Sequence, residues 1–205
     1  MERKSHWDDI YSRKAPTQVG WYQEHPLASL RFIEQTNVGK AGQIIDIGGG
    51  ASTLVDHLLA DGFAQLTVLD ISATAMQKTQ ERLGVRGGEV TWVEADVTEA
   101  ELPHHFYDIW HDRAVFHFLT QSDDRRHYLL SLHDALRPGG YAILATFSLD
   151  GPPTCSGLEV VRYSPETLLG ELGAGFHLVD SSRETHRTPS GSEQKYVFCL
   201  FRRHE

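Results

Sequence analysis

Short apolar runs alternate with segments of helical spacing along most of this chain. The runs predict strands at residues 43–47, 65–70, 89–94, 106–111 and 141–147. Between them, apolar residues recur at every third or fourth position, which is the period of an amphipathic helix. Helices are expected to open near Ser52, Ser72 and Ser122, and the last of these carries Leu136 before Pro138 and two glycines stop it. This alternation predicts a mostly parallel sheet with helices on both faces.

The two ends of the chain depart from this alternation. At the N-terminus, a capping box that begins at Ser5 predicts a short helix, and a second helix is expected from Leu27 to about Asn37. At the C-terminus, a helix opens at Ser164, and two further strands, which begin at Phe176 and near Lys195, are separated by a turn and no helix. A turn joins antiparallel strands, so these two should form a hairpin.

The predicted fold is therefore α/β, a Rossmann-like, doubly wound, seven-stranded and mostly parallel sheet with a C-terminal antiparallel hairpin. Residues 1–38 are too few for a core of their own, so we expect them to form a helical cover over a core of residues 39–205. The Gly- and Pro-rich loop 150–163 is longer than most connections in such sheets, which indicates a binding loop.

Composition narrows the range of partners. The chain has 205 residues and a formal net charge of −9, which argues against a general nucleic-acid or anionic-membrane binder. Its two cysteines imply no disulfide framework, and neither a signal peptide nor a spanning segment is evident, so a cytoplasmic location is expected. We expect a monomer or weak homodimer that acts on a small molecule.

Glycines and acids concentrate where the predicted strands end. The first strand leads through Asp46 into Gly48-Gly49-Gly50, and glycines there let a ligand approach the backbone closely. Asp70 ends the second strand, where a carboxylate can accept hydrogen bonds from a ribose. This pattern fits NAD or an adenosyl cofactor, but Thr53 stands where the NAD fingerprint has its third glycine.

The ordered set of motifs resembles the class I S-adenosyl-L-methionine (SAM)-dependent methyltransferases. The matching segments are Asp46–Gly50, Asp70, Glu94–Val97, Tyr107–Trp110 and Leu136–Gly140. Within that superfamily, Asp108 to Ala114 is similar to a pattern of the thiopurine methyltransferase-like branch and to one of the protein-lysine methyltransferase-like branch, with Ala114 in place of a glycine. The spacing of Trp7, Tyr11, Trp21 and Tyr22 resembles the aromatic cover of both branches.

The resemblance implies SAM as cofactor, S-adenosyl-L-homocysteine as product, and a role for each matching residue. The cofactor-binding residues that it implies are Asp46, Gly48, Gly50, Asp70, Ile71, Asp96, Val97 and His111. Trp21 can add a π face near the positive sulfonium. The candidate catalytic bases are His111, Asp112 and His117, because histidine titrates near neutral pH.

The sequence does not identify the molecule that accepts the methyl group. The candidate substrate residues are Trp21, Tyr22, Cys155, Arg162 and Tyr163, with Arg162 as a clamp for an anion. No metal site is expected, since His104 and His105 have no further ligands at suitable spacing. The expected function is methyl transfer to a thiol, amine or oxygen of a small molecule. The alternatives are a protein-lysine methyltransferase and a non-catalytic SAM- or nucleoside-binding module.

Overall fold

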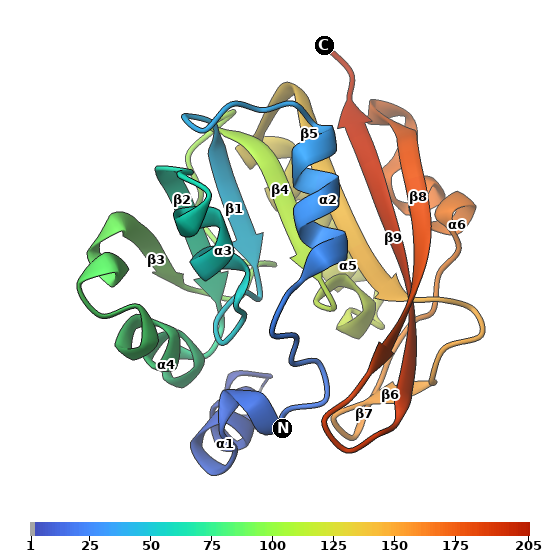
Figure 1. Cartoon of the computed structure of the whole chain (residues 1–205). Helices are drawn as coiled ribbons and strands as arrows, with labels where there is room; N and C mark the ends of the chain where they lie inside the picture. Colours follow the sequence, from blue (N-terminus) through green and yellow to red (C-terminus); the bar gives the residue numbers. More distant parts are fainter. Residues whose placement is uncertain (1–2) are drawn as a thin grey trace.

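A seven-stranded sheet forms the centre of the molecule in a computed structural model that describes residues 3–205. The strand order is β3-β2-β1-β4-β5-β9-β8 (Figure 1). β1 pairs in parallel with β2 and β4, β2 with β3, and β4 with β5, whereas β9 is antiparallel to both β5 and β8. The predicted fold class is thus confirmed.

The strands of this sheet and the small hairpin beside it have the following bounds: β1 Gln43–Ile47, β2 Gln65–Asp70, β3 Val90–Glu94, β4 Tyr107–Arg113, β5 Leu136–Phe147, β6 Thr154–Cys155, β7 Leu158–Glu159, β8 Phe176–Arg187 and β9 Glu193–Arg203. The α-helices are α1 Arg3–Arg13, α2 Leu27–Gln35, α3 Leu54–Ala60, α4 Ala73–Leu83, α5 Ser122–Ala135 and α6 Pro165–Leu172. Four 3₁₀ turns complete the chain: η1 Pro16–Gln18, η2 Gly84–Glu89, η3 Phe116–Phe118 and η4 Gly173–Gly175.

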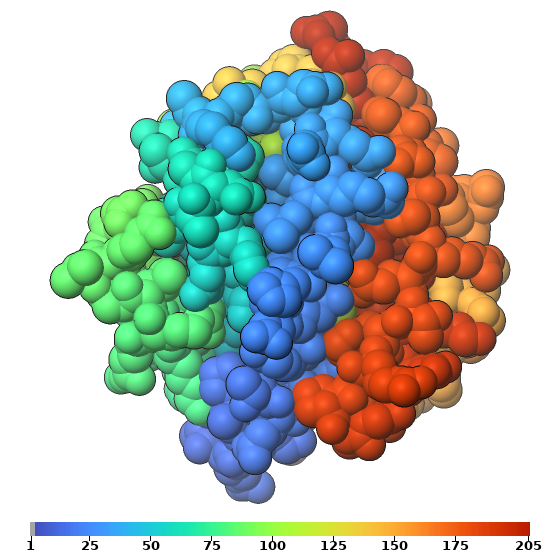
Figure 2. All heavy atoms as spheres, viewed as in Figure 1, coloured from blue at the N-terminus to red at the C-terminus, as the bar shows by residue number. Residues whose placement is uncertain are grey.

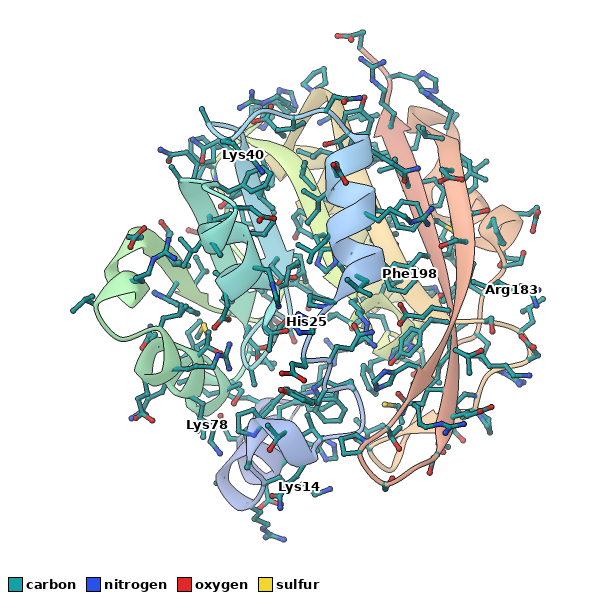
Figure 3. All side chains as sticks on the ribbon, in the orientation of Figure 1. Lys14, His25, Lys40, Lys78, Arg183 and Phe198 are labelled. Carbon is teal, nitrogen blue, oxygen red and sulfur yellow. The ribbon has the colours of Figure 1, made fainter. Side chains whose placement is uncertain are left out.

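Two apolar layers hold the helices to the sheet, one on each face. Ile44 belongs to the layer shared with α2 and α3, and its neighbour Ile45 belongs to the layer shared with α5 and α6. Successive side chains of a strand point to opposite faces, so a strand covered on both faces is apolar at nearly every position. Phe32 of α2 stacks on Phe198 of β9 at 5.9 Å between ring centroids, which fixes α2 across the sheet (Figures 1 and 3).

Several local predictions differ from the structure. Leu136 begins β5 instead of lying inside a helix, because it takes extended dihedrals and pairs with Tyr107 of β4. Ser5 lies within α1, which has already begun at Arg3, so it is not the cap that the sequence pattern indicated. The loop 150–163 contains the short hairpin of β6 and β7.

The N-terminal segment, here residues 3–25 ahead of α2, lies beyond the carboxyl ends of β1, β4 and β5 (Figure 1). Figure 2 shows it filling the space between α4 on one side and the β8–β9 hairpin on the other. It contacts both: Lys78 Nζ of α4 donates to the Lys14 carbonyl at 2.8 Å, and His186 of β8 hydrogen-bonds the Gly20 carbonyl at 2.9 Å. In residues 3–205, no helix has the length and apolar character that a bilayer crossing requires.

Candidate functional site

The glycine loop after β1 fits tightly against its neighbours. Gly48 has a φ of 68°, the left-handed region that favours glycine, and a Cβ there would lie 2.1 Å from a Val115 methyl. A Cβ on Gly49 would meet the Asp46 carboxylate at 2.3 Å, and one on Gly50 would meet the Asp70 carboxylate at 2.6 Å. Glycine is therefore required at all three positions, at Gly48 by the left-handed backbone and Val115, and at Gly49 and Gly50 by close packing onto the two acids.

Asp70 organises the loop from the end of β2. One carboxylate oxygen accepts the Gly50 N–H at 2.9 Å and the other accepts the Ser72 N–H at 2.8 Å. The residue is buried, and burial raises the pKa of Asp70 to about 6, although both backbone hydrogen bonds act to lower it. Each oxygen keeps lone pairs beyond these bonds, so the carboxylate can still accept from a ligand hydroxyl.

Asp46, His111 and Ser29 form a buried chain of hydrogen bonds. His111 Nδ1 lies 2.6 Å from one oxygen of Asp46, and His111 Nε2 lies 2.9 Å from the Ser29 hydroxyl of α2. An ionised carboxylate only accepts, so Nδ1–H donates to Asp46. The second oxygen of Asp46, Oδ2, is buried and has no hydrogen-bond partner within residues 3–205. His111 therefore orients a carboxylate whose free oxygen is available to a ligand.

Two clefts meet at the glycine loop. The β2–β3 cleft is lined by residues that include Leu69, Asp70, Ile71, Asp96, Val97 and Phe118. The glycine-loop cleft is lined by residues that include Ser29, Asp46, Gly49, Thr53 and His111. The residues common to both are Tyr11, Trp21, Ile47, Gly48 and Arg113, and we call this shared region the junction.

Aromatic side chains of the N-terminal segment close the junction. The Trp21 indole N–H donates to the Tyr11 hydroxyl at 3.1 Å, and the Trp7 ring meets those of Trp21 and Phe118 edge to face at 5.6 and 5.1 Å. Trp7 and Tyr11 of α1 pack into the same apolar cluster, and Asp8 of the same helix accepts from the Ser72 hydroxyl at 2.6 Å. The cover is thus attached next to the Asp70 turn.

Asp96 lies at the far side of the β2–β3 cleft. One of its oxygens accepts from the backbone and hydroxyl of Thr98, and the other accepts from Arg3 Nη1 at 3.1 Å. Arg3 also pairs with Asp124 of α5. Ile71 and Val97 line the same cleft, so the structure brings together the acid and the two apolar residues that the resemblance singled out.

Two of the three predicted bases do not reach either cleft. The Asp112 carboxylate is buried and accepts from the Tyr128 hydroxyl and from the backbone N–H groups of Val115 and Phe116. His117 is buried as well, its Nδ1 accepts the Phe147 N–H, and burial lowers the pKa of His117 to about 3. The geometry contradicts a base role for Asp112 and His117, because both are enclosed within the protein. His111 lines the glycine-loop cleft, but both of its ring nitrogens are already bonded.

Three further predicted site residues lie elsewhere. Arg162 donates to the Leu149 and Gly151 carbonyls, so it holds the loop 150–163 together and lines neither cleft. Tyr163 packs against Phe116 in the core, away from both clefts. Gly50 is covered by Asp70 and also lines neither. These positions do not support the clamp role of Arg162, the pocket role of Tyr163 or direct cofactor contact by Gly50.

The other predicted substrate residues do line the clefts. Trp21 lies at the junction, Tyr22 lines the glycine-loop cleft, and Cys155 of β6 lines the β2–β3 cleft. Burial raises the pKa of the Cys155 thiol to about 11, so it remains protonated at neutral pH. The loop 150–163 therefore reaches the site through β6 and β7 and not through Arg162.

Arg113 is the site residue that sequence reasoning did not place. It ends β4, and its side chain lies at the junction. The next residue, Ala114, has a φ of 74°, so the glycine found there in the resembling pattern would be less strained. The signal that could have found Arg113 is its position one residue after Asp112, at the carboxyl end of the central strand β4, where ligands of such sheets bind.

Two features of the clefts make them suitable for a SAM molecule. The unpartnered Asp46 Oδ2 suits an ammonium group, and the Gly48 backbone at the junction lets a ligand approach closely. On the other side of the junction, Asp70 suits ribose hydroxyls, and Ile71 and Val97 offer apolar surface to a base. A ligand with an amino-acid end and a nucleoside end would span both clefts.

Comparisons with known proteins agree with this arrangement. A family profile described as "Methyltransferase domain" matches residues 45–142. EEF1A lysine methyltransferase 2 of Danio rerio is 26% identical over 190 residues, which cover 86% of this chain and 76% of that protein. The solved structure described as "Conversion of a Disulfide Bond into a Thioacetal Group during Echinomycin Biosynthesis" has a TM-score of 0.81 and 21% identity, and the match covers 99% of this chain and 94% of that one.

A second solved structure was obtained with a cofactor product in place. It is 1,6-didemethyltoxoflavin-N1-methyltransferase of Burkholderia thailandensis with bound 1,6-didemethyltoxoflavin and S-adenosylhomocysteine. It aligns with a TM-score of 0.71 and 21% identity, over 98% of this chain and 84% of that one. The family match and the fold support neither NAD as the cofactor nor a non-catalytic SAM- or nucleoside-binding module. The chain therefore contains a methyltransferase domain, has the fold of class I methyltransferases, and acts as a SAM-dependent methyltransferase with SAM as its cofactor.

Proposed function

We propose that this enzyme methylates a small molecule that binds at the junction of its two clefts. In this proposal Asp46 holds the amino group of SAM, Asp70 holds the ribose, and Asp96, Ile71 and Val97 surround the adenine. Bound SAM would supply a methyl group on a sulfonium: the acceptor's lone pair forms a bond to the methyl carbon in line, the sulfur–carbon bond breaks, and S-adenosylhomocysteine leaves. The chain contributes alignment of the acceptor with that methyl group, and positioning of this kind can lower a barrier by about 7–11 kcal/mol.

The enclosure of the junction is the observation that carries the proposal. Trp7, Tyr11 and Trp21 cover it from the N-terminal side, and Cys155 and Leu158 of the β6–β7 hairpin line the β2–β3 cleft that opens into it. Arg3 ties the start of α1 to Asp96 across the cleft. An enclosed aromatic pocket suits a compact acceptor, because binding buries most of a small ligand's surface.

The clefts offer no evident base, which limits the type of acceptor. Among the side chains of residues 3–205 that line them, Tyr11 and Cys155 both have pKa values raised by burial, and His111 is bonded at both nitrogens. Asp46, Asp70 and Asp96 are assigned to the cofactor. We therefore propose an acceptor that is nucleophilic at neutral pH without a base, namely a thiolate or an unprotonated amine, over an alcohol.

A protein lysine is the second candidate acceptor. It is favoured by the similarity to EEF1A lysine methyltransferase 2, which extends over 86% of this chain. A lysine side chain would have to enter beside the aromatic cover and to lose its proton in a pocket that contains Arg113. A nearby cation such as Arg113 lowers the pKa of a lysine ammonium, which favours loss of its proton. The same cation repels the charged ammonium as it enters, so the positive charge of the pocket argues against this candidate.

One labelling experiment separates the two candidates. Purified enzyme is incubated with methyl-labelled SAM and a cell extract divided by ultrafiltration into small molecules and macromolecules. We expect label in the small-molecule fraction, with S-adenosylhomocysteine formed in equal amount. Label confined to acid-precipitable protein would contradict the small-molecule proposal, and no binding of SAM or S-adenosylhomocysteine in calorimetry would contradict the cofactor assignment as well.

A further inference from the structure

Arg113 places a buried positive charge at the junction. It is the last residue of β4, it lines both clefts, and its side chain is only 11% exposed. A guanidinium is always charged and carries five N–H donors. Burial of such a group is unfavourable unless its donors and its charge are compensated, so each side of Arg113 needs a partner.

One edge of the guanidinium is already used. Nη1 donates to the Trp21 carbonyl at 3.0 Å, and the Tyr196 ring lies with its centroid 4.6 Å from the guanidinium carbon. These contacts attach the aromatic cover to β4 and stack the planar group on an aromatic face. They explain why Arg113 is held in place, but they leave the other edge of the group unexplained.

The opposite edge has no hydrogen bond. Within residues 3–205, Nε and Nη2 of Arg113 are both buried without a hydrogen-bond partner; Glu184 forms an ion pair with Nη2 at 4.0 Å, beyond hydrogen-bond distance. Glu184 also accepts from the Gln23 amide at 2.9 Å, so it is already engaged. Nε–H and the neighbouring Nη2–H are parallel donors, and this is the pair that binds both oxygens of one carboxylate.

From this free edge we infer that the acceptor is a small organic acid whose carboxylate is bound by Nε and Nη2 of Arg113. The inference rests on the proposed function and adds a substrate class to it. Such an acid would compensate both Arg113 and the sulfonium of SAM, two cations that meet at the junction under that proposal. Its apolar part would lie among Trp7, Trp21 and Phe118, which line the same space.

The test uses two probes of equal shape, benzoate and benzamide. The full-length protein is saturated with S-adenosylhomocysteine, and each probe is titrated at constant ionic strength while the fluorescence of the tryptophans is recorded. Trp7 and Trp21 line the cleft, so a ligand there should change the signal. The variants are Arg113→Gln, Arg113→Lys and the control Arg183→Gln, whose arginine is 75% exposed on β8 and lines neither cleft (Figure 3).

We expect wild-type protein to bind benzoate at least about tenfold more tightly than benzamide, as a bidentate charged pair should. The Arg183→Gln variant should keep that preference, the Arg113→Gln variant should lose it, and the Arg113→Lys variant, which keeps the charge without the fork, should lie between them. Equal affinities in the wild type, no benzoate binding, or a preference that persists in the Arg113→Gln variant would overturn the inference.

The wild-type result decides the matter even if a variant does not fold. Folding and S-adenosylhomocysteine affinity are measured for each protein before the probes are added. If wild-type protein fails to bind S-adenosylhomocysteine, the cofactor site assigned under the proposed function is wrong. If it binds S-adenosylhomocysteine but treats both probes alike, only the carboxylate assignment to Arg113 is wrong.

Discussion

Replacement of Asp70 by Asn should separate cofactor binding from stability. Asn keeps the shape of the side chain but removes its charge and one of its two acceptor oxygens. In the folded protein those oxygens accept the N–H groups of Gly50 and Ser72. The variant therefore leaves one buried backbone N–H without an acceptor, which destabilises by about 1–3 kcal/mol.

The loss of charge acts in the opposite direction. The pKa of Asp70 is raised from 3.8 to about 6, so at pH 7 its ionised form destabilises the folded state by about 3 kcal/mol. Removal of that charge offsets the lost hydrogen bond, and the Asp70→Asn variant should be within about 2 kcal/mol of wild type at pH 7. A raised carboxyl pKa is unfavourable only as the pH rises above 3.8, so this destabilisation becomes smaller as the pH is lowered. On going from pH 7 to pH 5, the free energy of unfolding of wild type should therefore increase by about 1 kcal/mol relative to the variant.

Cofactor affinity should change much more than stability. A hydrogen bond to a charged group contributes about 1.5–3 kcal/mol, so the Asp70→Asn variant should bind S-adenosylhomocysteine about 10- to 150-fold more weakly at pH 7.5. Wild-type affinity should fall as the pH drops below about 6, where Asp70 takes up a proton, and the variant should not show that fall.

Calorimetric titration and urea unfolding at several pH values measure both effects. The matched control is Asp61→Asn, which removes an exposed carboxylate at the end of α3. An unchanged dissociation constant in a folded Asp70→Asn variant would refute the ribose role of Asp70. Equal pH dependence of affinity in both proteins would show that another group is responsible for it.

Three further predictions test other parts of the site. Asp46→Asn should raise the dissociation constant of SAM about tenfold or more, because the buried free oxygen loses its charge. Calorimetry should find unchanged affinity for adenosine, which has no amino-acid end. Between pH 7 and pH 5, wild type should lose about 2 kcal/mol of unfolding free energy relative to His117→Gln, because only the unfolded state takes up the imidazole proton in that range. An equal change in the urea unfolding curves of the two proteins between these pH values would count against a neutral buried His117. Deletion of residues 1–23 should reduce turnover about tenfold or more, since Tyr11 and Trp21 would no longer close the junction, whereas circular dichroism should show that the sheet is still folded. Full turnover in the shortened protein would exclude closure of the junction as the role of this segment.

The sequence by itself determined the sheet and the cofactor end of the site. Hydrophobic period is a local property, so β1, β2 and α3 could be located from their own residues. Asp46 and Asp70 lie near the carboxyl ends of parallel neighbouring strands, and the carboxyl ends of parallel strands meet at one edge. Their convergence at the glycine loop therefore follows from pattern and topology alone. Leu136 was misplaced because its strand dihedrals come from pairing with Tyr107, a contact distant in sequence.

Only the tertiary structure decided which polar side chains face the clefts. His117 and Asp112 have the residue types of catalytic bases, but the packing of η3 and Tyr128 encloses them. Arg162 and Arg113 are indistinguishable as cations in the sequence, yet one is bonded to its own loop and the other leaves a guanidinium edge free at the junction. Side-chain direction at the end of a strand depends on neighbours far along the chain, here Trp21 and Tyr196, and no local pattern carries that information.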